Sequence, residues 1–193
     1  MAIVLATAQA EPVRYVLDTD HSYPYFAVRH LGMSELQGRF NKMTGWAEMD
    51  MEAKGGKVEV RIEVASLDTG MPLRDKNLLR GVLGTTFFEP EKFPFMTYRS
   101  DTVVFEGEQP IRIEGELTLQ GVTRKVPIQI THFHCAFNPL RLAKGCGGRA
   151  IGRIKRSEFG MAGMPSLIGD EIDLIINVEA YPNISANERP SAR

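Results

Sequence analysis

Apolar and polar residues alternate one by one along several segments, and this alternation limits the possible folds more than any other feature. In the segment 111–119, isoleucine and leucine occupy one parity while arginine and glutamate occupy the other. Successive side chains of a β-strand point to opposite faces, so such a segment forms a strand with one buried and one wet face. The segment 57–67 repeats the pattern with Val58, Val60, Ile62 and Val64.

Further segments have the same strand-like character, at 15–18, 45–51, 95–106, 126–135, 149–155 and 171–180. Gln120 to Thr123 forms a tight hairpin turn between two of the strands. Only the region 68–93 lacks this alternation. Its apolar residues follow a near-helical spacing at Leu73, Leu78, Val82 and Leu83, which predicts a short helix and then an aromatic-rich loop. About eight strands without alternating βα units indicate an antiparallel barrel or sandwich, and an eight-stranded barrel encloses either packed side chains or one elongated ligand.

The stretch 21–40 predicts an antiparallel hairpin with a large, partly polar inner face. It opens with His21-Ser22, continues as an extended run and turns at Leu31-Gly32 into a second run that ends at Phe40. Phe26, Val28 and His30 share one face of the first run, because they are two residues apart.

Composition and charge give the class of protein but no partner. The chain has 193 residues, 43% of them hydrophobic, which predicts one domain with a real core. The net charge of −1, without long blocks of one sign, gives no indication of a nucleic-acid or anionic-membrane surface. No run approaches the roughly 18 to 20 consecutive apolar residues that a transmembrane helix needs.

The two ends of the sequence differ in character from its middle. Residues 1–10 are small and apolar and end in Ala8-Gln9-Ala10, which has the form of a secretory cleavage site. They predict the remnant of an export signal, with a frayed natural N-terminus as the alternative. We expect a single barrel domain over 11–182 and a flexible polar tail over 183–193.

The only two cysteines, Cys135 and Cys146, flank a segment rich in loop-forming residues. Three interpretations are open at this point. In an exported protein the two thiols would form a disulfide, and in a cytosolic one they would stay free. In the third interpretation they bind a metal together with His132 and His134, because a His-x-His on a strand places both rings on one face, as zinc and copper sites do. Strict alternation from Val126 points both rings inward.

Motifs of common catalytic sites are absent from the sequence. It has no Gly-x-Ser-x-Gly elbow, phosphate loop, dinucleotide fingerprint or His-Glu-x-x-His zinc helix. A catalytic group assembled from distant residues stays open.

A series of short motifs, in order, resembles the YceI-like family of polyisoprenoid-binding proteins. The resemblance covers roughly residues 15–181 and rests on these residues: His21-Ser22, Phe26, Val28, His30, Gly32, Gly38, Phe40, Ala65 to Thr69, Arg74-Asp75, Phe87-Phe88, Phe93-Pro94, Gly115, Leu117-Thr118, Gly121 to Thr123, Arg156-Ser157 and Phe159-Gly160. Two features depart from the family pattern: Pro24 puts the local strand pairing in doubt, and the histidines at 132 and 134 leave room for a specialised headgroup or a metal.

The resemblance implies an elongated, eight-stranded antiparallel lipocalin-like barrel with a short helix after the fourth strand. It implies export to the periplasm, a homodimer, a Cys135–Cys146 bridge and a possible membrane cytochrome as partner. The expected function is non-catalytic: an apolar tunnel binds a long-chain isoprenoid lipid, such as an isoprenoid quinone, for transport or storage. The alternatives are a redox or lipid-modifying enzyme, and a stress-related barrel that acts through protein contacts.

Two sets of side chains are the candidates for the ligand site. The first would line the tunnel, although each member could instead be ordinary core: Phe26, Val28, His30, Phe40, Leu67, Met71, Leu73, Leu78, Phe87, Phe88, Phe93, Met96, Tyr98, Phe159 and Met161. The second set would lie at the tunnel entrance, where each member would either hold the structure together or bind a polar headgroup: Arg74, Asp75, Arg156 and Ser157.

Overall fold

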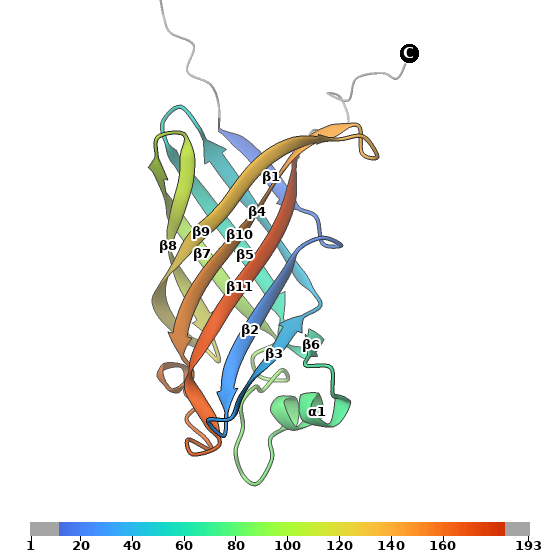
Figure 1. Cartoon of the computed structure of the whole chain (residues 1–193), viewed down its shortest axis with the longest axis vertical. Helices are drawn as coiled ribbons and strands as arrows, with labels where there is room; N and C mark the ends of the chain where they lie inside the picture. The colour runs from blue at the N-terminus through green and yellow to red at the C-terminus, as the bar shows by residue number, and fades with distance from the viewer. Residues whose placement is uncertain (1–11, 184–193) are drawn as a thin grey trace, which may run out of the picture.

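The chain folds into a tall, closed β-barrel with one short helix at its lower end (Figure 1). The structure is a computed structural model that describes residues 12–183, so the predicted signal remnant at 1–10 and all of the predicted tail except Asn183 lie outside the described residues. The strands are β1 (Val13–Leu17), β2 (Tyr23–His30), β3 (Ser34–Phe40), β4 (Met43–Asp50), β5 (Gly55–Glu63), β6 (Leu67–Asp68), β7 (Phe95–Glu106), β8 (Gln109–Leu119), β9 (Val122–Asn138), β10 (Ala143–Lys155) and β11 (Ile168–Pro182).

Some of these strands are two halves of one longer strand. β1 and β2 both pair with β11, one after the other, and β4 and β3 pair with β1 and β2 in the same way. β5 continues into β6 after the 3-10 turn Val64–Ser66. Counted as continuous strands, the barrel has eight, all antiparallel, and the pairing of β1 with β11 closes it. The predicted fold class is therefore confirmed.

The two ends of the barrel are built differently. One end, here the hairpin end, carries the β4–β5, β7–β8 and β9–β10 turns. The other, the α1 end, carries the β2–β3 turn, helix α1 (Pro72–Arg80) and the long connection from β10 to β11, which includes the 3-10 turn Arg156–Phe159. Figure 1 shows the hairpin end uppermost and the α1 end below.

The helix is shorter than its apolar spacing predicted. It begins at Pro72, whose fixed φ suits a first helical turn, and ends at Arg80 because Gly81 adopts a φ of +84°. Val82 and Leu83 therefore lie in a turn beyond the helix, and the Leu83 side chain is exposed instead of packed.

The long hairpin β9–β10 corrects two further expectations. The segment 136–145, expected as a loop, is strand up to Asn138 and again from Ala143. The ladder also shifts register, because His132 lies opposite Arg149 while Ile130 lies opposite Ala150. Thr131 is thus an extra residue, and it reverses the alternation that follows. His132 and His134 point outward and are exposed, so the inward orientation predicted from strict alternation is wrong.

Pro24 does not disturb the strand pairing. It is buried in β2 opposite Ile176 of β11, and the β2–β3 ladder begins one residue later, at Tyr25. At Pro24, β2 pairs with β11 but not yet with β3, so the missing N–H of proline removes no hydrogen bond from the β2–β3 ladder. No helix among residues 12–183 has the length and apolar character that crossing a membrane requires.

Candidate ligand cavity

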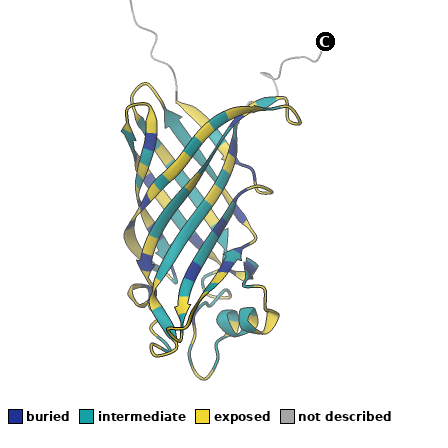
Figure 2. Ribbon diagram, in the orientation of Figure 1, coloured by how far each residue is buried: buried dark blue, intermediate teal, exposed yellow. Residues whose placement is uncertain are grey.

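A cavity of about 760 Å³ occupies the inside of the barrel. Its wall consists of the inward faces that the alternating segments provide, for example Val60 and Ile62 of β5 and Leu174 and Ile176 of β11. Figure 2 shows that exposed residues alternate with partly buried and buried ones along the strands. The interior is therefore not completely filled by its own side chains, as a packed barrel would be.

Most of the predicted lining residues do face the cavity: Phe26, Val28, His30, Phe40, Met71, Leu73, Leu78, Phe87, Phe88, Met96, Tyr98 and Met161. Three do not. Leu67 and Phe159 are buried in the main hydrophobic core, and Phe93 packs against Gly121. Whether the lining residues bind lipid stays a prediction.

Sequence reasoning missed much of the wall. It chose residues in or near the family motifs, most of them aromatic residues, methionines and leucines, and it left the regular strands as ordinary core. The missed residues are the inward members of these strands, among them Val58, Val60, Ile62, Ile113, Ile128, Ile130, Ala150, Leu174, Ile176 and Val178. The alternation in the sequence marks them, once the barrel is known to be hollow.

Arg156 is a buried arginine at the α1 end. Its guanidinium donates hydrogen bonds to the carbonyl oxygens of Gly169 and Ile168, at 2.8 Å each, and to that of Met161. Burial lowers the pKa of Arg156. Although it borders the cavity, its donors are used to tie the β10–β11 connection together, so it acts as a clamp.

The other three predicted headgroup residues also hold backbone segments. The hydroxyl and backbone N–H of Ser157 both donate to the Asp170 carboxylate, and these hydrogen bonds lower the pKa of Asp170. Asp75 accepts from the backbone N–H and hydroxyl of Thr69, and Arg74 donates to the Thr69 carbonyl at 2.6 Å. These contacts fasten α1 to the end of β6. Arg74 borders the cavity, whereas Asp75 and Ser157 do not.

Tyr98 places a hydroxyl inside the barrel. It lies over Gly115 of the neighbouring strand, where a Cβ would be only 2.5 Å from the ring, and donates toward the carbonyls of Val126 at 2.9 Å and Ile113 at 3.3 Å. Burial, and then the charge of Glu114, raise the pKa of Tyr98. It is a neutral, internally bonded group.

Two polar residues of the wall are different. His30 at the end of β2 and Asn77 on α1 border the cavity, yet their side chains make no hydrogen bond to any part of the chain between residues 12 and 183. Both lie at the α1 end. Their donors and acceptors are available to a ligand there.

The disulfide predicted between Cys135 and Cys146 is present, and it joins β9 to β10 close to the hairpin end. The interpretation of a metal site with His132 and His134 is wrong, because both sulfurs are bonded to each other and both imidazoles face outward. The interpretation of free thiols is also excluded.

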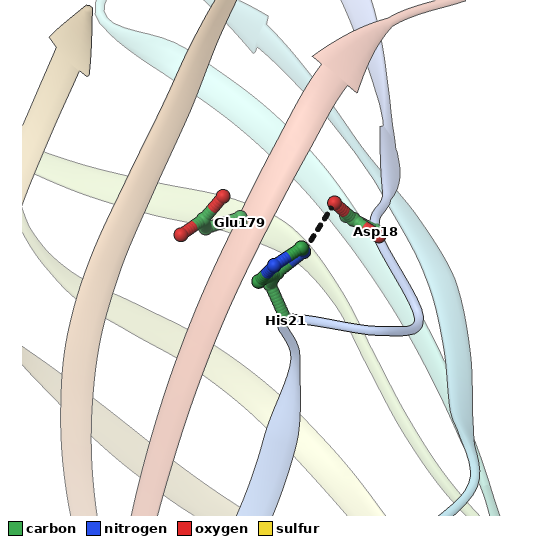
Figure 3. A group of neighbouring side chains, drawn as sticks. All are labelled: Asp18, His21 and Glu179. Carbon is green, nitrogen blue, oxygen red and sulfur yellow. Dashed lines mark hydrogen bonds and ion pairs between the residues drawn. The ribbon is translucent and has the colours of Figure 1, made fainter. Parts of the chain in front are cut away.

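A second polar cluster lies outside the cavity, where the β1–β2 turn meets β11 (Figure 3). The ligand atoms of Asp18, His21 and Glu179 all lie within 4.8 Å of one another. His21 Nδ1 is 2.8 Å from an Asp18 oxygen, and Arg141 of the β9–β10 hairpin binds the same oxygen at 2.7 Å. The Arg141 guanidinium thus already supplies the cluster with a positive charge.

Both titratable partners of this cluster are perturbed. Burial acts to raise the pKa of Asp18, but the hydrogen bonds from His21 and the Asp20 N–H, together with the charge of Arg141, outweigh it and the pKa is lowered. The hydrogen bond and the charge of Asp18 raise the pKa of His21. The arrangement therefore joins three chain segments through charge: the β1–β2 turn, the hairpin and β11.

Comparison with known proteins places the whole barrel in one family. The model of the YceI-like domain matches residues 15–180. The relatives include Protein YceI of Salmonella arizonae and of Salmonella enteritidis, each 32% identical over 181 residues that cover 92% of both chains.

Solved structures with the same fold include the YCEI protein of Campylobacter jejuni, at 26% identity and a TM-score of 0.65 over 81% of this chain and 90% of that one. BcnA of Burkholderia cenocepacia has 22% identity and a TM-score of 0.64 over 84% and 98%. A polyisoprenoid-binding domain from Saccharophagus degradans, implicated in plant cell wall breakdown, has 15% identity and a TM-score of 0.61 over 88% and 99%.

Proposed function

This chain belongs to the YceI-like family, and from that premise we propose that its barrel binds one long-chain isoprenoid lipid, of the quinone or polyprenyl type, for transport or storage. The observation that carries the proposal is the cavity of about 760 Å³ with its apolar wall. The domain from Saccharophagus degradans, which is described as polyisoprenoid-binding, supports the choice of ligand class.

The cavity wall suits a ligand without polar atoms along its length. Burying each carbon group of a chain contributes about 0.8 kcal/mol, so each five-carbon unit contributes roughly 3 to 4 kcal/mol before association costs are subtracted. Hydrocarbon burial is non-directional, and the wall would therefore select the length and width of a chain better than its identity. We expect the protein to accept several long isoprenoids.

A polar headgroup would lie at the α1 end. Arg74, Tyr98 and Arg156 already donate to the chain itself, whereas the His30 ring and the Asn77 amide have free hydrogen-bonding capacity within residues 12–183. A quinone oxygen or a terminal hydroxyl would accept a hydrogen bond from either. Because the other titratable wall groups at this end are held structurally, we favour binding over catalysis.

The cellular setting is part of the proposal. The Cys135–Cys146 disulfide supports an oxidising compartment such as the periplasm. A homodimer and a membrane cytochrome as partner stay predictions from the family resemblance.

The experiment is an affinity measurement with a long-chain quinone added from ethanol to the purified protein. Ala150 lines the cavity from β10, so Ala150→Phe fills part of its volume. Gln129 lies on the exposed face of β9, opposite Ile151, and Gln129→Phe adds a similar side chain outside the barrel. We expect Ala150→Phe to weaken binding at least tenfold and Gln129→Phe to leave it within twofold. Equal affinities for the two variants, or no binding by the unaltered protein, would overturn the proposal.

A further inference from the structure

Exposed apolar side chains gather at the α1 end of the barrel. They come from the β2–β3 turn, the start of α1, the turn after α1 and the β10–β11 connection: Leu31, Met33, Met71, Leu73, Leu83 and Leu167. We call this set the α1-end rim. Met33 and Leu83 are 79% and 88% exposed, and they stand at the tips of separate turns. Figures 1 and 2 show these segments around the lower end of the barrel.

The rim segments are held against one another. The N–H of Leu31 donates to the carbonyl of Leu167 at 2.8 Å, which joins the β2–β3 turn to the β10–β11 connection. The turn after α1 packs on the same connection, because a Cβ added at Gly163 would meet the methyl group of Thr85. The rim is therefore one fixed surface, contributed by segments far apart in the sequence.

The rim is also continuous with the cavity. Met71 and Leu73 are about half exposed and border the cavity at the same time. An apolar chain that leaves the cavity between them would meet apolar surface before it meets water. The hairpin end has a comparable opening, because Val13 and Met51 are likewise both exposed and part of the wall. Phe137, Leu140 and Leu142 of the β9–β10 hairpin are exposed at the same end.

Charged side chains lie beside both openings. On α1, Lys76 and Arg80 are exposed, while the one acid of the helix, Asp75, is hydrogen-bonded to Thr69. At the hairpin end, the tips 50–54 and 106–109 together carry four carboxylates and one lysine, whereas the β9–β10 tip carries Arg141 and is followed by Lys144. The charged residues of the first two tips are Asp50, Glu52, Glu106, Glu108 and Lys54.

We propose that the α1-end rim docks on an anionic phospholipid bilayer, so that a lipid passes between bilayer and cavity without crossing water. The proposal rests on the function proposed above. Leucine and methionine at turn tips enter the interfacial region of a bilayer, and Lys76 and Arg80 reach the phosphate groups beside them. The acidic tips of the hairpin end would be repelled by the same surface.

The test measures partitioning of the protein onto vesicles of phosphatidylcholine with phosphatidylglycerol, by flotation. The double variant Met33→Asp with Leu83→Asp should lose at least tenfold in partition coefficient. Neither side chain borders the cavity, so equilibrium affinity for an added quinone in solution should stay within twofold. Reversing charge with Lys76→Glu and Arg80→Glu should weaken partitioning on these vesicles and leave it unchanged on pure phosphatidylcholine.

Leu140 provides the matched control, because it is 94% exposed in the β9–β10 turn at the opposite end. Leu140→Asp should leave partitioning within twofold. The proposal fails if the unaltered protein does not float with anionic vesicles, or if Leu140→Asp reduces partitioning as much as the double variant does.

The two proposals fail in different measurements. If the protein bound no quinone in solution, the proposed ligand would be excluded, while flotation would still test whether the rim docks on a bilayer. Normal quinone binding without flotation would exclude docking of the rim on a bilayer. The rim would then bind a protein, or the lipid would leave through the hairpin end.

Discussion

The α1 end and the hairpin end of the barrel are both held by contacts between neighbouring segments, but these contacts use different chemistry. At the α1 end the clamp is Arg156, which donates to three backbone carbonyls. At the hairpin end the corresponding contacts are the Cys135–Cys146 disulfide and the charged cluster of Asp18, His21 and Arg141. The groups bonded to Arg156 are backbone carbonyls, which do not titrate. The contacts at the hairpin end should respond to a reductant, through the disulfide, and to pH, through His21.

The largest expected effect comes from breaking the α1-end clamp. Arg156→Met leaves three carbonyls without their donor in a buried site, and each unsatisfied acceptor costs about 1 to 3 kcal/mol. We expect the free energy of unfolding, measured by urea titration, to fall by about 3 kcal/mol or more. The control is Arg153→Met, which removes exposed ion pairs with Asp173 and Glu171 and should cost less than about 1 kcal/mol. Similar losses in both variants would show that Arg156 is not a clamp.

The disulfide should give the next largest effect. Replacing Cys135 and Cys146 by serine releases a crosslink with a sequence separation of 11, which on the chain-entropy model costs about 2 to 3 kcal/mol. Dithiothreitol should lower the stability of the unaltered protein to the same level and leave the double variant unchanged. A reductant effect on the double variant would contradict this assignment.

Removing the cation from the charged cluster should have a smaller effect. Arg141→Gln leaves the buried Asp18 carboxylate with His21 as its charged partner. Because the Arg141 side chain is 44% exposed, solvent screens part of the interaction and we expect a loss of about 1 kcal/mol. Arg99→Gln, in a surface pair with Glu59, serves as the control and should change the stability by less than about 0.5 kcal/mol.

The smallest effect is a pH dependence of stability, to which His21 and Asp18 at the hairpin end contribute. The raised pKa of His21 means that its contribution is complete below about pH 6.5 and is lost as the pH rises through the folded-state value. The lowered pKa of Asp18 works in the opposite direction: its contribution is present above pH 3.8 and is lost as the pH falls through the folded-state value.

Thermal unfolding measured from pH 6 to pH 8 tests the direction of the His21 effect on stability. Stability should decline over this range in the unaltered protein, and His21→Gln should remove part of the decline. Arg156→Met should keep the full decline at a lower overall stability. If His21→Gln and the unaltered protein show the same pH profile, the cluster does not act as described.

The fold was predictable because each strand has one apolar face that turns away from water. Alternation placed Val60, Ile62, Leu174 and Ile176 on inward faces, and the structure agrees. The tight turn predicted at Gln120 to Thr123 is confirmed. Gln120 and Gly121 connect β8 to β9, and both adopt positive φ values. Patterns of period two are local, and a barrel is the closed arrangement that buries all of these faces.

The errors arose where one residue changes the local geometry. The bulge at Thr131 turned His132 and His134 outward, and nothing in a single sequence marks an extra strand residue. The positive φ of Gly81 ended the helix before Leu83. Arg156 shows a third limit: its three acceptors are backbone carbonyls, which carry no sequence signature.

The most direct measurement is liquid chromatography with mass spectrometry on an organic-solvent extract of the protein, purified without detergent from the cells that make it. Binding in the cavity predicts an isoprenoid lipid close to one per chain, and much less of it in an Ala150→Phe variant purified in the same way. An extract without lipid, from a protein that also fails to take up added long-chain quinone, would contradict the lipid-binding function of the barrel.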